Sequence, residues 1–183
     1  FIDSIEQEIN QPFARIAGRS HGLQQHMAYF KRINAINYVL AHDDGVNPKN
    51  FAEADIILIG VSRTGKTPTC LYLAMQYGIA AANYPLTEED MSLIRLPKLL
   101  ESVQNKLFGL TLSATQLHLI RQERRPNSEY ASLAQCQREI QWQQSLFKQV
   151  GIPYLDTTSI SIEEISAIIL DRSGLKRQLY GFG

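Results

Sequence analysis

Hydrophobic positions along the chain follow a helical period first and then form short runs typical of buried strands. An isoleucine stripe marks residues 2–9, and residues 27–41 carry large apolar side chains mostly at helical spacing. This second stretch stops at residues 42–45, His-Asp-Asp-Gly, a sequence that strongly favours a turn. The pattern therefore predicts a helical N-terminal segment over residues 1–50, ahead of a main domain over residues 51–183.

From residue 51 onward the pattern alternates between strand and helix. Short apolar runs predict strands at residues 54–59, 79–83, 107–112 and 152–155. The first expected helix spans residues 66–77 and is closed by Gly78. A second runs from Thr87 through Leu100 towards Asn105. Three more are expected from Ser113 to Arg125, at 132–150, and from Ser161 through Leu170. Ser113 with Gln116, and Ser161 with Glu164, have the spacing of capping boxes. Strands separated by single helices favour a parallel sheet with helices on both faces.

Residues 60–67 match the phosphate-binding P-loop pattern G-x-x-x-x-G-K-[ST] at every fixed position. Glycines let successive backbone N–H groups turn towards phosphate oxygens, and the N-terminus of the following helix adds partial positive charge. Lys66 can reach the β- and γ-phosphates, and the Thr67 hydroxyl can bind Mg²⁺. A plain glycine turn with an exposed lysine is disfavoured, because an apolar strand precedes the motif and an apolar helix follows it. The predicted nucleotide-binding residues are Gly60, Val61, Ser62, Arg63, Thr64, Gly65, Lys66 and Thr67.

The motif and the element pattern together predict the fold class. We expect an α/β, P-loop kinase-like fold of three layers with a mostly parallel sheet, preceded by the helical N-terminal segment. A switch GTPase would need an Asn-Lys-x-Asp motif, and here Asn105-Lys106 is followed by Leu107-Phe108. The Leu-Ser-Gly-Gly-Gln signature of transporter ATPases is also missing from the sequence. These absences favour a compact kinase-like protein.

Composition and charge exclude several function classes. Lysine plus arginine equals aspartate plus glutamate at 18 each, so nothing indicates bulk electrostatic binding of nucleic acid or of an anionic membrane. No apolar run reaches membrane-spanning length. Cys70 and Cys136 lie among apolar neighbours without a zinc-type spacing, which favours free thiols in a reducing cytoplasm. We therefore expect a cytoplasmic protein.

Carboxylates occur at two places that suit phosphoryl transfer. Asp43 and Asp44 could hold Mg²⁺ or accept a hydroxyl proton, although their spacing alone favours a simple turn. Asp156 ends an apolar strand, where it could support Mg²⁺ through a water molecule or cap the following helix, and both interpretations stay open.

Three arginines gather at the end of one predicted helix, at positions 121, 124 and 125. Guanidinium groups at this place could clamp phosphates. The alternative is a solvated helix end whose positive charges complement the helix dipole, and for any single arginine this alternative is favoured.

Several segments resemble the bacterial phosphoenolpyruvate synthase regulatory proteins, whose plant relatives regulate pyruvate, phosphate dikinase. The matching segments are 29–36, 42–45, 60–69, 82–86, 108–111, 120–124 and 161–164. The similarity covers nearly the whole chain, and these motifs are specific in combination. Gly65 and Thr69 suit the synthase branch better than the plant branch. Family members are longer at the N-terminus, so the chain resembles the family without its first segment.

The resemblance implies a bifunctional enzyme. Such proteins phosphorylate a threonine of the synthase with ADP as the donor, which inactivates the synthase. They also remove that phosphate with inorganic phosphate, which releases pyrophosphate. The implied cofactors and co-substrates are ADP, inorganic phosphate and Mg²⁺, and the implied partner is phosphoenolpyruvate synthase, with no nucleic acid or membrane. Homo-oligomer formation stays open.

The resemblance also raises particular residues to catalytic candidates. Beside Lys66 and Arg63 of the loop, it adds His42, Asp43 and Asp44, with one of the two aspartates as the base near the target threonine. Thr67 and, through water, Asp156 are the candidate metal ligands.

Two other functions are compatible with the same loop. One is a small-metabolite kinase of shikimate-kinase type, which would phosphorylate a small acceptor rather than a protein. The other is a nucleotide-binding module without turnover. The sequence does not reveal the donor preference, the base or the oligomeric state.

Overall fold

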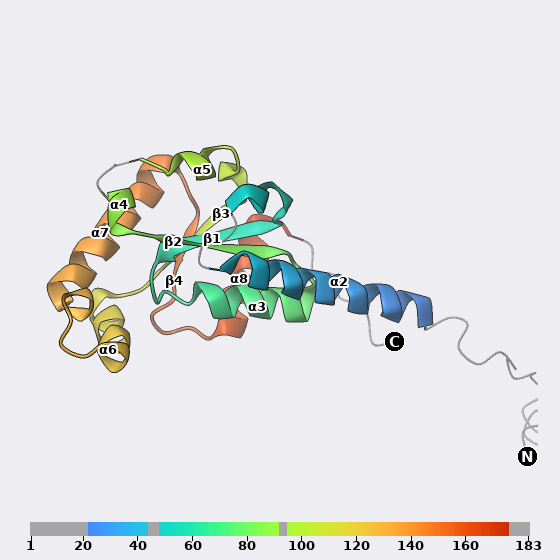
Figure 1. Cartoon of the computed structure of the whole chain (residues 1–183), viewed down its shortest axis with the longest axis horizontal. Helices are drawn as coiled ribbons and strands as arrows, with labels where there is room; N and C mark the ends of the chain where they lie inside the picture. The colour runs from blue at the N-terminus through green and yellow to red at the C-terminus, as the bar shows by residue number, and fades with distance from the viewer. Residues whose placement is uncertain (1–21, 44–47, 92–94, 176–183) are drawn as a thin grey trace, which may run out of the picture.

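The computed structural model describes residues 22–43, 48–91 and 95–175 (Figure 1). Its centre is a four-stranded, all-parallel sheet in the order β2-β1-β3-β4. The strands are β1 (Ile56–Val61), β2 (Ala81–Leu86), β3 (Leu107–Thr111) and β4 (Tyr154–Asp156). The predicted α/β fold with a parallel sheet is confirmed, and each predicted strand exists with its ends moved by at most three residues.

Helices connect and cover these strands. The α-helices are α2 (Gly22–Ala41), α3 (Lys66–Tyr77), α4 (Glu88–Met91), α5 (Lys98–Glu101), α6 (Ala114–Arg124), α7 (Leu133–Val150) and α8 (Ile162–Ser173). Short 3-10 turns form η2 (Pro48–Glu53), η3 (Gln104–Lys106) and η4 (Glu129–Ala131). The expected caps are present: Ser113 Oγ accepts from Gln116 N, Ser161 Oγ accepts from Glu164 N, and Gly78 ends α3 with φ 65°.

One predicted helix is wrong. The stretch from Thr87 towards Asn105 is not one helix, because α4, α5 and η3 follow one another there as separate short pieces. Its start is as expected, since Asp90 accepts a hydrogen bond from Thr87 N at 2.9 Å. Pro97 explains the break before α5, because proline lacks an N–H and disfavours helical backbone at the residue before it.

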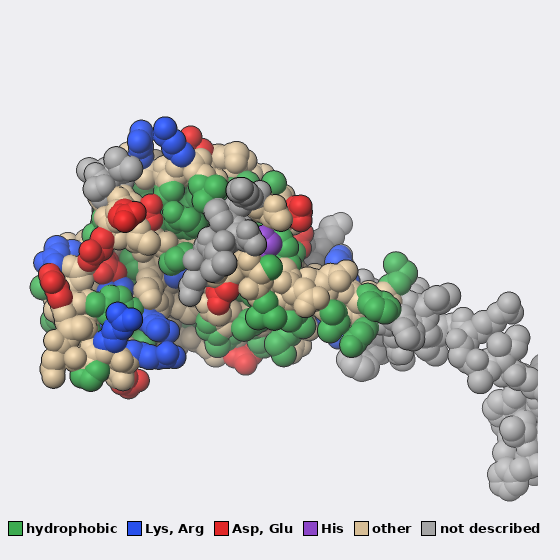
Figure 2. All heavy atoms as spheres, in the orientation of Figure 1, with side chains coloured by type: hydrophobic (Ala, Val, Ile, Leu, Met, Phe, Trp, Pro, Cys, Tyr) green, Lys and Arg blue, Asp and Glu red, His purple; other side chains and the backbone are tan. Residues whose placement is uncertain are grey.

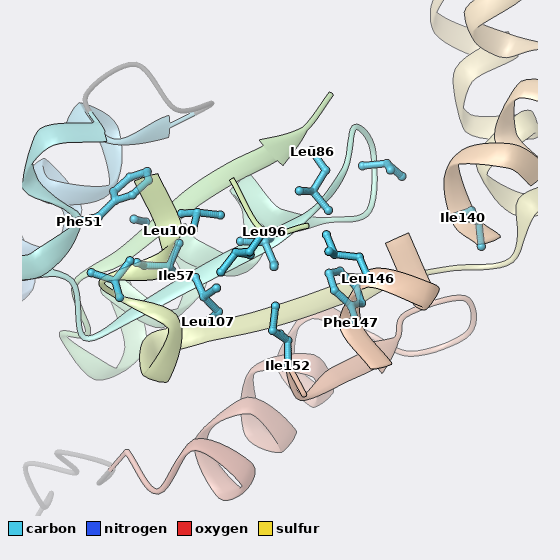
Figure 3. Close-up of a cluster of buried hydrophobic side chains, with 14 of the residues drawn as sticks. Phe51, Ile57, Leu86, Leu96, Leu100, Leu107, Ile140, Leu146, Phe147 and Ile152 are labelled. Atoms are coloured by element: carbon cyan, nitrogen blue, oxygen red, sulfur yellow. The ribbon is translucent and has the colours of Figure 1, made fainter. Parts of the chain in front are cut away.

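The core lies on both faces of the sheet, because successive strand residues point to opposite sides. From β1, Ile57 and Ile59 join a cluster with residues of α5 and α7, which Figure 3 shows in close-up. Ile56 and Leu58 face the other way, into a second cluster with residues of α2, α3 and α8. The three expected layers are therefore confirmed, with the P-loop strand in the middle layer.

The helix α2 represents the described part of the predicted N-terminal helical segment. Ala35 and Val39, towards its C-terminal end, are buried in the second cluster. Its other half extends away from the body, where Tyr29 and Phe30 are exposed (Figures 1 and 2). The isoleucine stripe at residues 2–9 lies outside the described residues. The end of α2 thus belongs to the same core as the sheet, and it leads directly to His42.

Within the part of the chain that the structure describes, no helix has both the length and the apolar character needed to cross a membrane.

Candidate functional site

The predicted P-loop, residues 60–67, joins the end of β1 to the start of α3, which is the strand, loop and helix context that phosphate binding by this motif requires. Arg63 and Gly65 both have left-handed backbone, with φ of 77° and 90°. For Arg63 this conformation is uncommon, because its Cβ crowds the backbone there. Gly65 precedes α3 without a side-chain cap, so no side chain of its own covers the first N–H groups of the helix. This is the arrangement that receives an anion at a helix N-terminus.

Gly60 has no room for a side chain. A Cβ atom at this position would lie 2.4 Å from the carbonyl oxygen of Leu110 on β3 and 3.0 Å from Thr64 Oγ1. The loop therefore starts pressed against the neighbouring strand. The first fixed glycine of the motif is needed here for close approach of two backbones.

The lysine of the motif is buried and already oriented by the loop. Lys66 is 5% exposed, and its Nζ donates to the carbonyl oxygen of Val61 at 2.9 Å. Thr64 Oγ1 donates to the same oxygen at 3.0 Å. The ammonium group is thus fixed against the loop rather than extended into solvent, so little side-chain entropy remains to be lost when it meets a phosphate.

Three polar side chains meet at the C-terminal end of the loop. Thr67 Oγ1 donates to Asp43 Oδ1 at 2.8 Å. Asn83 Nδ2 donates to Asp43 Oδ1 at 2.6 Å and to Thr67 Oγ1 at 2.9 Å. Asp43 follows α2, Thr67 opens α3 and Asn83 lies on β2, so the fold joins three separate segments at this point. The structure therefore places one predicted aspartate directly beside the loop, whereas Asp44 lies outside the described residues.

His42, the residue before Asp43, packs against aromatic rings. Its ring stacks on Tyr38 with centroids 4.0 Å apart, and Nδ1 lies 2.8 Å from the Tyr38 carbonyl oxygen. Because a carbonyl only accepts, this contact needs the proton on Nδ1. The Nε2 atom is buried without a hydrogen-bond partner among the described residues. Burial, with Glu53 and Asp55 adding to it, raises the pKa of Tyr38 to about 12, so its hydroxyl stays a donor to Asn50 O.

The other end of the loop is held by a buried ion pair. Arg121 is 1% exposed and forms two hydrogen bonds to Glu139, from Nη1 to Oε1 at 3.0 Å and from Nη2 to Oε2 at 2.6 Å. Its Nη2 also donates to the carbonyl oxygen of Ser62 at 3.2 Å. Burial by itself lowers the pKa of Arg121, but the hydrogen bonds and charge of Glu139 outweigh it and raise the pKa. Arg121 therefore stays charged and, together with Glu139, supports the loop backbone from α6 and α7.

This position of Arg121 corrects both sequence interpretations of the arginine cluster. The side chain is neither a solvated helix end nor a free phosphate clamp, because Glu139 occupies it. Arg124 and Arg125 are exposed, as is Arg63 in the loop. Arg63, Arg124 and Arg125 are therefore the exposed arginines among those predicted to contact phosphate.

Two further side chains support the loop and carried no signal in the sequence. The Tyr130 hydroxyl donates to Ser62 Oγ at 3.0 Å, while the Tyr130 ring lies 4.0 Å from the Arg121 guanidinium carbon. Gln143 is fully buried on α7, where its Oε1 accepts from Val61 N at 2.9 Å and its Nε2 donates to Thr111 Oγ1 at 2.9 Å. Both lie far along the chain from the loop, so only the fold reveals them.

Asp156 lies at the end of β4, as expected, and is exposed. Its Oδ1 accepts from the backbone N of Thr158 at 2.9 Å and from the Thr158 hydroxyl. These contacts form a local turn after the strand. A role in metal binding through water stays a prediction for this residue.

Both cysteines are free and buried, as predicted. Burial, with a contribution from the charge of Asp43, raises the pKa of the Cys70 thiol, which keeps it protonated. Within the described ranges, no three or more histidine, cysteine or acidic side chains gather as a metal site.

Comparison with known proteins identifies relatives along almost the entire chain. The profile of the family described as Kinase/pyrophosphorylase matches residues 1–170. A provisionally named phosphoenolpyruvate synthase regulatory protein of Nitrosomonas eutropha is 58% identical over 177 residues, which is 97% of this chain. Proteins of the same name from Laribacter hongkongensis and Aeromonas hydrophila are each 52% identical, over 178 and 180 residues.

The chain spans about two thirds of the length of these curated relatives: 64% of the Nitrosomonas eutropha protein and 65% of the Laribacter hongkongensis protein.

Proposed function

The chain belongs to the kinase/pyrophosphorylase family, and from this premise we propose that it regulates a phosphoenolpyruvate synthase by reversible phosphorylation. In the proposed forward reaction, ADP phosphorylates a threonine of the synthase and inactivates it. In the proposed second reaction, inorganic phosphate removes the phosphoryl group as pyrophosphate and restores the synthase. The observation that carries this proposal is the P-loop conformation, in which Lys66 is held against Val61 O and Thr67 contacts Asp43.

The forward reaction requires little covalent chemistry from the protein itself. The threonine oxygen attacks the β-phosphorus of ADP, the bond from that phosphorus to the α–β bridging oxygen breaks, and AMP leaves. The threonine proton passes to a base, for which Asp43 and Asp44 are the candidates, and His42 is a further predicted catalytic residue. The loop N–H groups and Lys66 would stabilise charge on the transferred group, which is the main catalytic contribution in such reactions.

The second reaction could use the same phosphate-binding groups. An oxygen of inorganic phosphate attacks the phosphorus of phosphothreonine, the bond from phosphorus to the threonine oxygen breaks, and that oxygen regains a proton. Pyrophosphate then occupies the position that the ADP diphosphate occupies in the forward direction. One diphosphate-sized cradle therefore suits both reactions.

A P-loop by itself does not distinguish a diphosphate from a triphosphate, so a preference for ADP over ATP must come from other residues. Arg63, Arg124 and Arg125 are exposed cations on the loop and on the end of α6, whose Arg121 contacts Ser62 O. If they surround the β-phosphate, the γ-phosphate of ATP would fall where the acceptor threonine must lie. ATP would then bind without correct alignment, and binding without alignment does not accelerate transfer.

The experiment incubates the chain with phosphoenolpyruvate synthase and either β-labelled ADP freed of ATP or γ-labelled ATP freed of ADP. We expect label from ADP on a synthase threonine, and competition by ATP for binding without transfer. Transfer from ATP at the rate seen with ADP would contradict the donor assignment. Transfer to a small hydroxyl compound instead of the synthase would favour a small-metabolite kinase.

A further inference from the structure

The Asp43 carboxylate and the Thr67 hydroxyl have the chemistry and the spacing of two neighbouring Mg²⁺ ligands. Thr67 is the last residue of the P-loop, where a hydroxyl binds Mg²⁺ together with an aspartate from elsewhere in P-loop NTPases. Adjacent ligands of an octahedral Mg²⁺ lie about 2.8–3.0 Å apart when each is about 2.0–2.1 Å from the ion. Thr67 Oγ1 and Asp43 Oδ1 are 2.8 Å apart. These two oxygens therefore fit a shared ion without a change in their separation.

Other carboxylates near the loop fit this role less well. In β3, which lies beside β1 in the sheet, the last two residues are Leu110 and Thr111, and Leu112 follows the strand; none of these three is acidic. Asp156 lies on β4, one strand further from β1, and it accepts hydrogen bonds from Thr158. Asp43 is the carboxylate that contacts the loop hydroxyl in the described structure.

Asn83 holds this pair of oxygens in place. Its side-chain nitrogen donates to Asp43 Oδ1 and to Thr67 Oγ1, and its side chain is almost fully buried. Its backbone N also donates to the carbonyl oxygen of His42 at 3.3 Å. Asn83 thereby attaches the segment after α2 to β2. An amide nitrogen does not bind Mg²⁺, so Asn83 acts as a positioning residue.

We propose that Asp43 and Thr67 form the protein side of a Mg²⁺ site shared with the diphosphate of the nucleotide, and that Asn83 positions both. Mg²⁺ in phosphoryl-transfer sites takes one or two side-chain oxygens and completes its shell with phosphate oxygens and water. Two protein ligands therefore suffice, in agreement with the lack of a larger cluster among the described residues. The inference rests on the proposed function only in requiring that a nucleoside diphosphate occupies the loop.

The assignment also divides the roles of the two aspartates. A carboxylate that binds Mg²⁺ is a weak proton acceptor, because the cation lowers its basicity. Asp43 then serves the metal, and the threonine proton passes to another group, for which the neighbouring Asp44 is the candidate.

The test measures ADP affinity of the full chain by calorimetry, once in EDTA and once with Mg²⁺. We expect Mg²⁺ to tighten ADP binding to the unaltered chain. Asp43→Asn should bind ADP in EDTA much as the unaltered chain does, yet lose about tenfold or more of the gain from Mg²⁺. Asp171→Asn, which removes an exposed carboxylate on α8, is the matched control and should keep the full response to Mg²⁺.

A second readout follows the metal itself. With Mn²⁺ as the probe, electron paramagnetic resonance gives the affinity of the ADP-bound chain for the ion. Asn83→Ala should weaken this affinity about 10- to 100-fold, as expected for a residue that orients a metal ligand. Should Asp43→Asn fail to fold, Thr67→Val and Thr67→Ser replace it: serine should keep the Mg²⁺ response and valine should lose it.

The outcomes separate this inference from the proposed function. An unchanged Mg²⁺ response in Asp43→Asn, equal responses in the two Thr67 variants, or loss of the response in Asp156→Asn alone overturns the metal assignment while ADP binding stands. Failure of the unaltered chain to bind ADP under either condition overturns the proposed function and this inference together.

Discussion

The two ends of the phosphate-binding loop are held by different chemistry. At Ser62, the loop contacts a buried arginine that is paired with Glu139 and covered by the Tyr130 ring. At Thr67, it contacts the half-buried Asp43 and the amide of Asn83. One end thus rests on a closed, charge-matched pair, and the other presents a carboxylate beside the first turn of α3.

We therefore expect the Ser62 end to support the structure of the loop and the Thr67 end to take part in ligand binding. The charge of Arg121 is already matched inside the protein by two hydrogen bonds to Glu139, so we expect this arginine to contribute to the folded shape of the loop rather than to anion binding. Asp43 is only partly buried and accepts hydrogen bonds from the side chains of Thr67 and Asn83, so we expect its substitution to change the ligand response more than the fold. Substitutions at the Ser62 end should therefore affect stability first, and those at the Thr67 end should affect ligand response first.

The largest expected effect is at Glu139. Glu139→Ala leaves the Arg121 guanidinium buried without its counter-charge, and such a loss costs about 3–5 kcal/mol. Urea denaturation should show this decrease in the free energy of unfolding. Glu123→Ala, which removes an exposed carboxylate on α6, should change it by less than about 0.5 kcal/mol. A decrease below about 1 kcal/mol for Glu139→Ala would contradict the supporting role of the ion pair.

Lys66→Ala should give the next largest effect, on rate rather than on folding. Removing the loop's fixed cation from the transferred phosphate is expected to slow both directions by about a hundredfold or more. Single-turnover transfer from ADP measures the forward direction, and pyrophosphate release measures the reverse. Lys148→Ala, on the exposed surface of α7, is the control. Near-normal rates with Lys66→Ala would remove the P-loop from the mechanism.

Tyr130→Phe should give the smallest effect. It keeps the ring over Arg121 and removes the hydrogen bond to Ser62 Oγ, which is worth about 0.5–1.5 kcal/mol. We expect a small loss of stability and a modest loss of ADP affinity, with the Mg²⁺ response unchanged because the Thr67 end is intact. Tyr29→Phe, at an exposed tyrosine of α2, controls for loss of a hydroxyl. A lost Mg²⁺ response in Tyr130→Phe would show that the two ends are not independent.

Contacts between residues close in sequence were predictable. The P-loop occupies residues 60–67, and its function depends on backbone conformation within that short segment. The caps at Ser113 and Ser161 each join residues three apart, and both form as predicted. The helix expected from Thr87 towards Asn105 failed, because the apolar pattern continued across Pro97 although the backbone could not.

The amino-acid sequence by itself therefore determined the parallel α/β fold, the loop between β1 and α3 and the helix starts at Ser113 and Ser161, since each depends on local periodicity or on spacing within one turn. Only the tertiary structure decided which distant residues reach the loop. Register pairs Asn83 with Leu58 across β2 and β1, and packing of α6 on α7 brings Glu139 to Arg121. These contact partners lie in segments far apart in the sequence. Packing of the core brings them together, so their proximity cannot be read from their spacing along the chain.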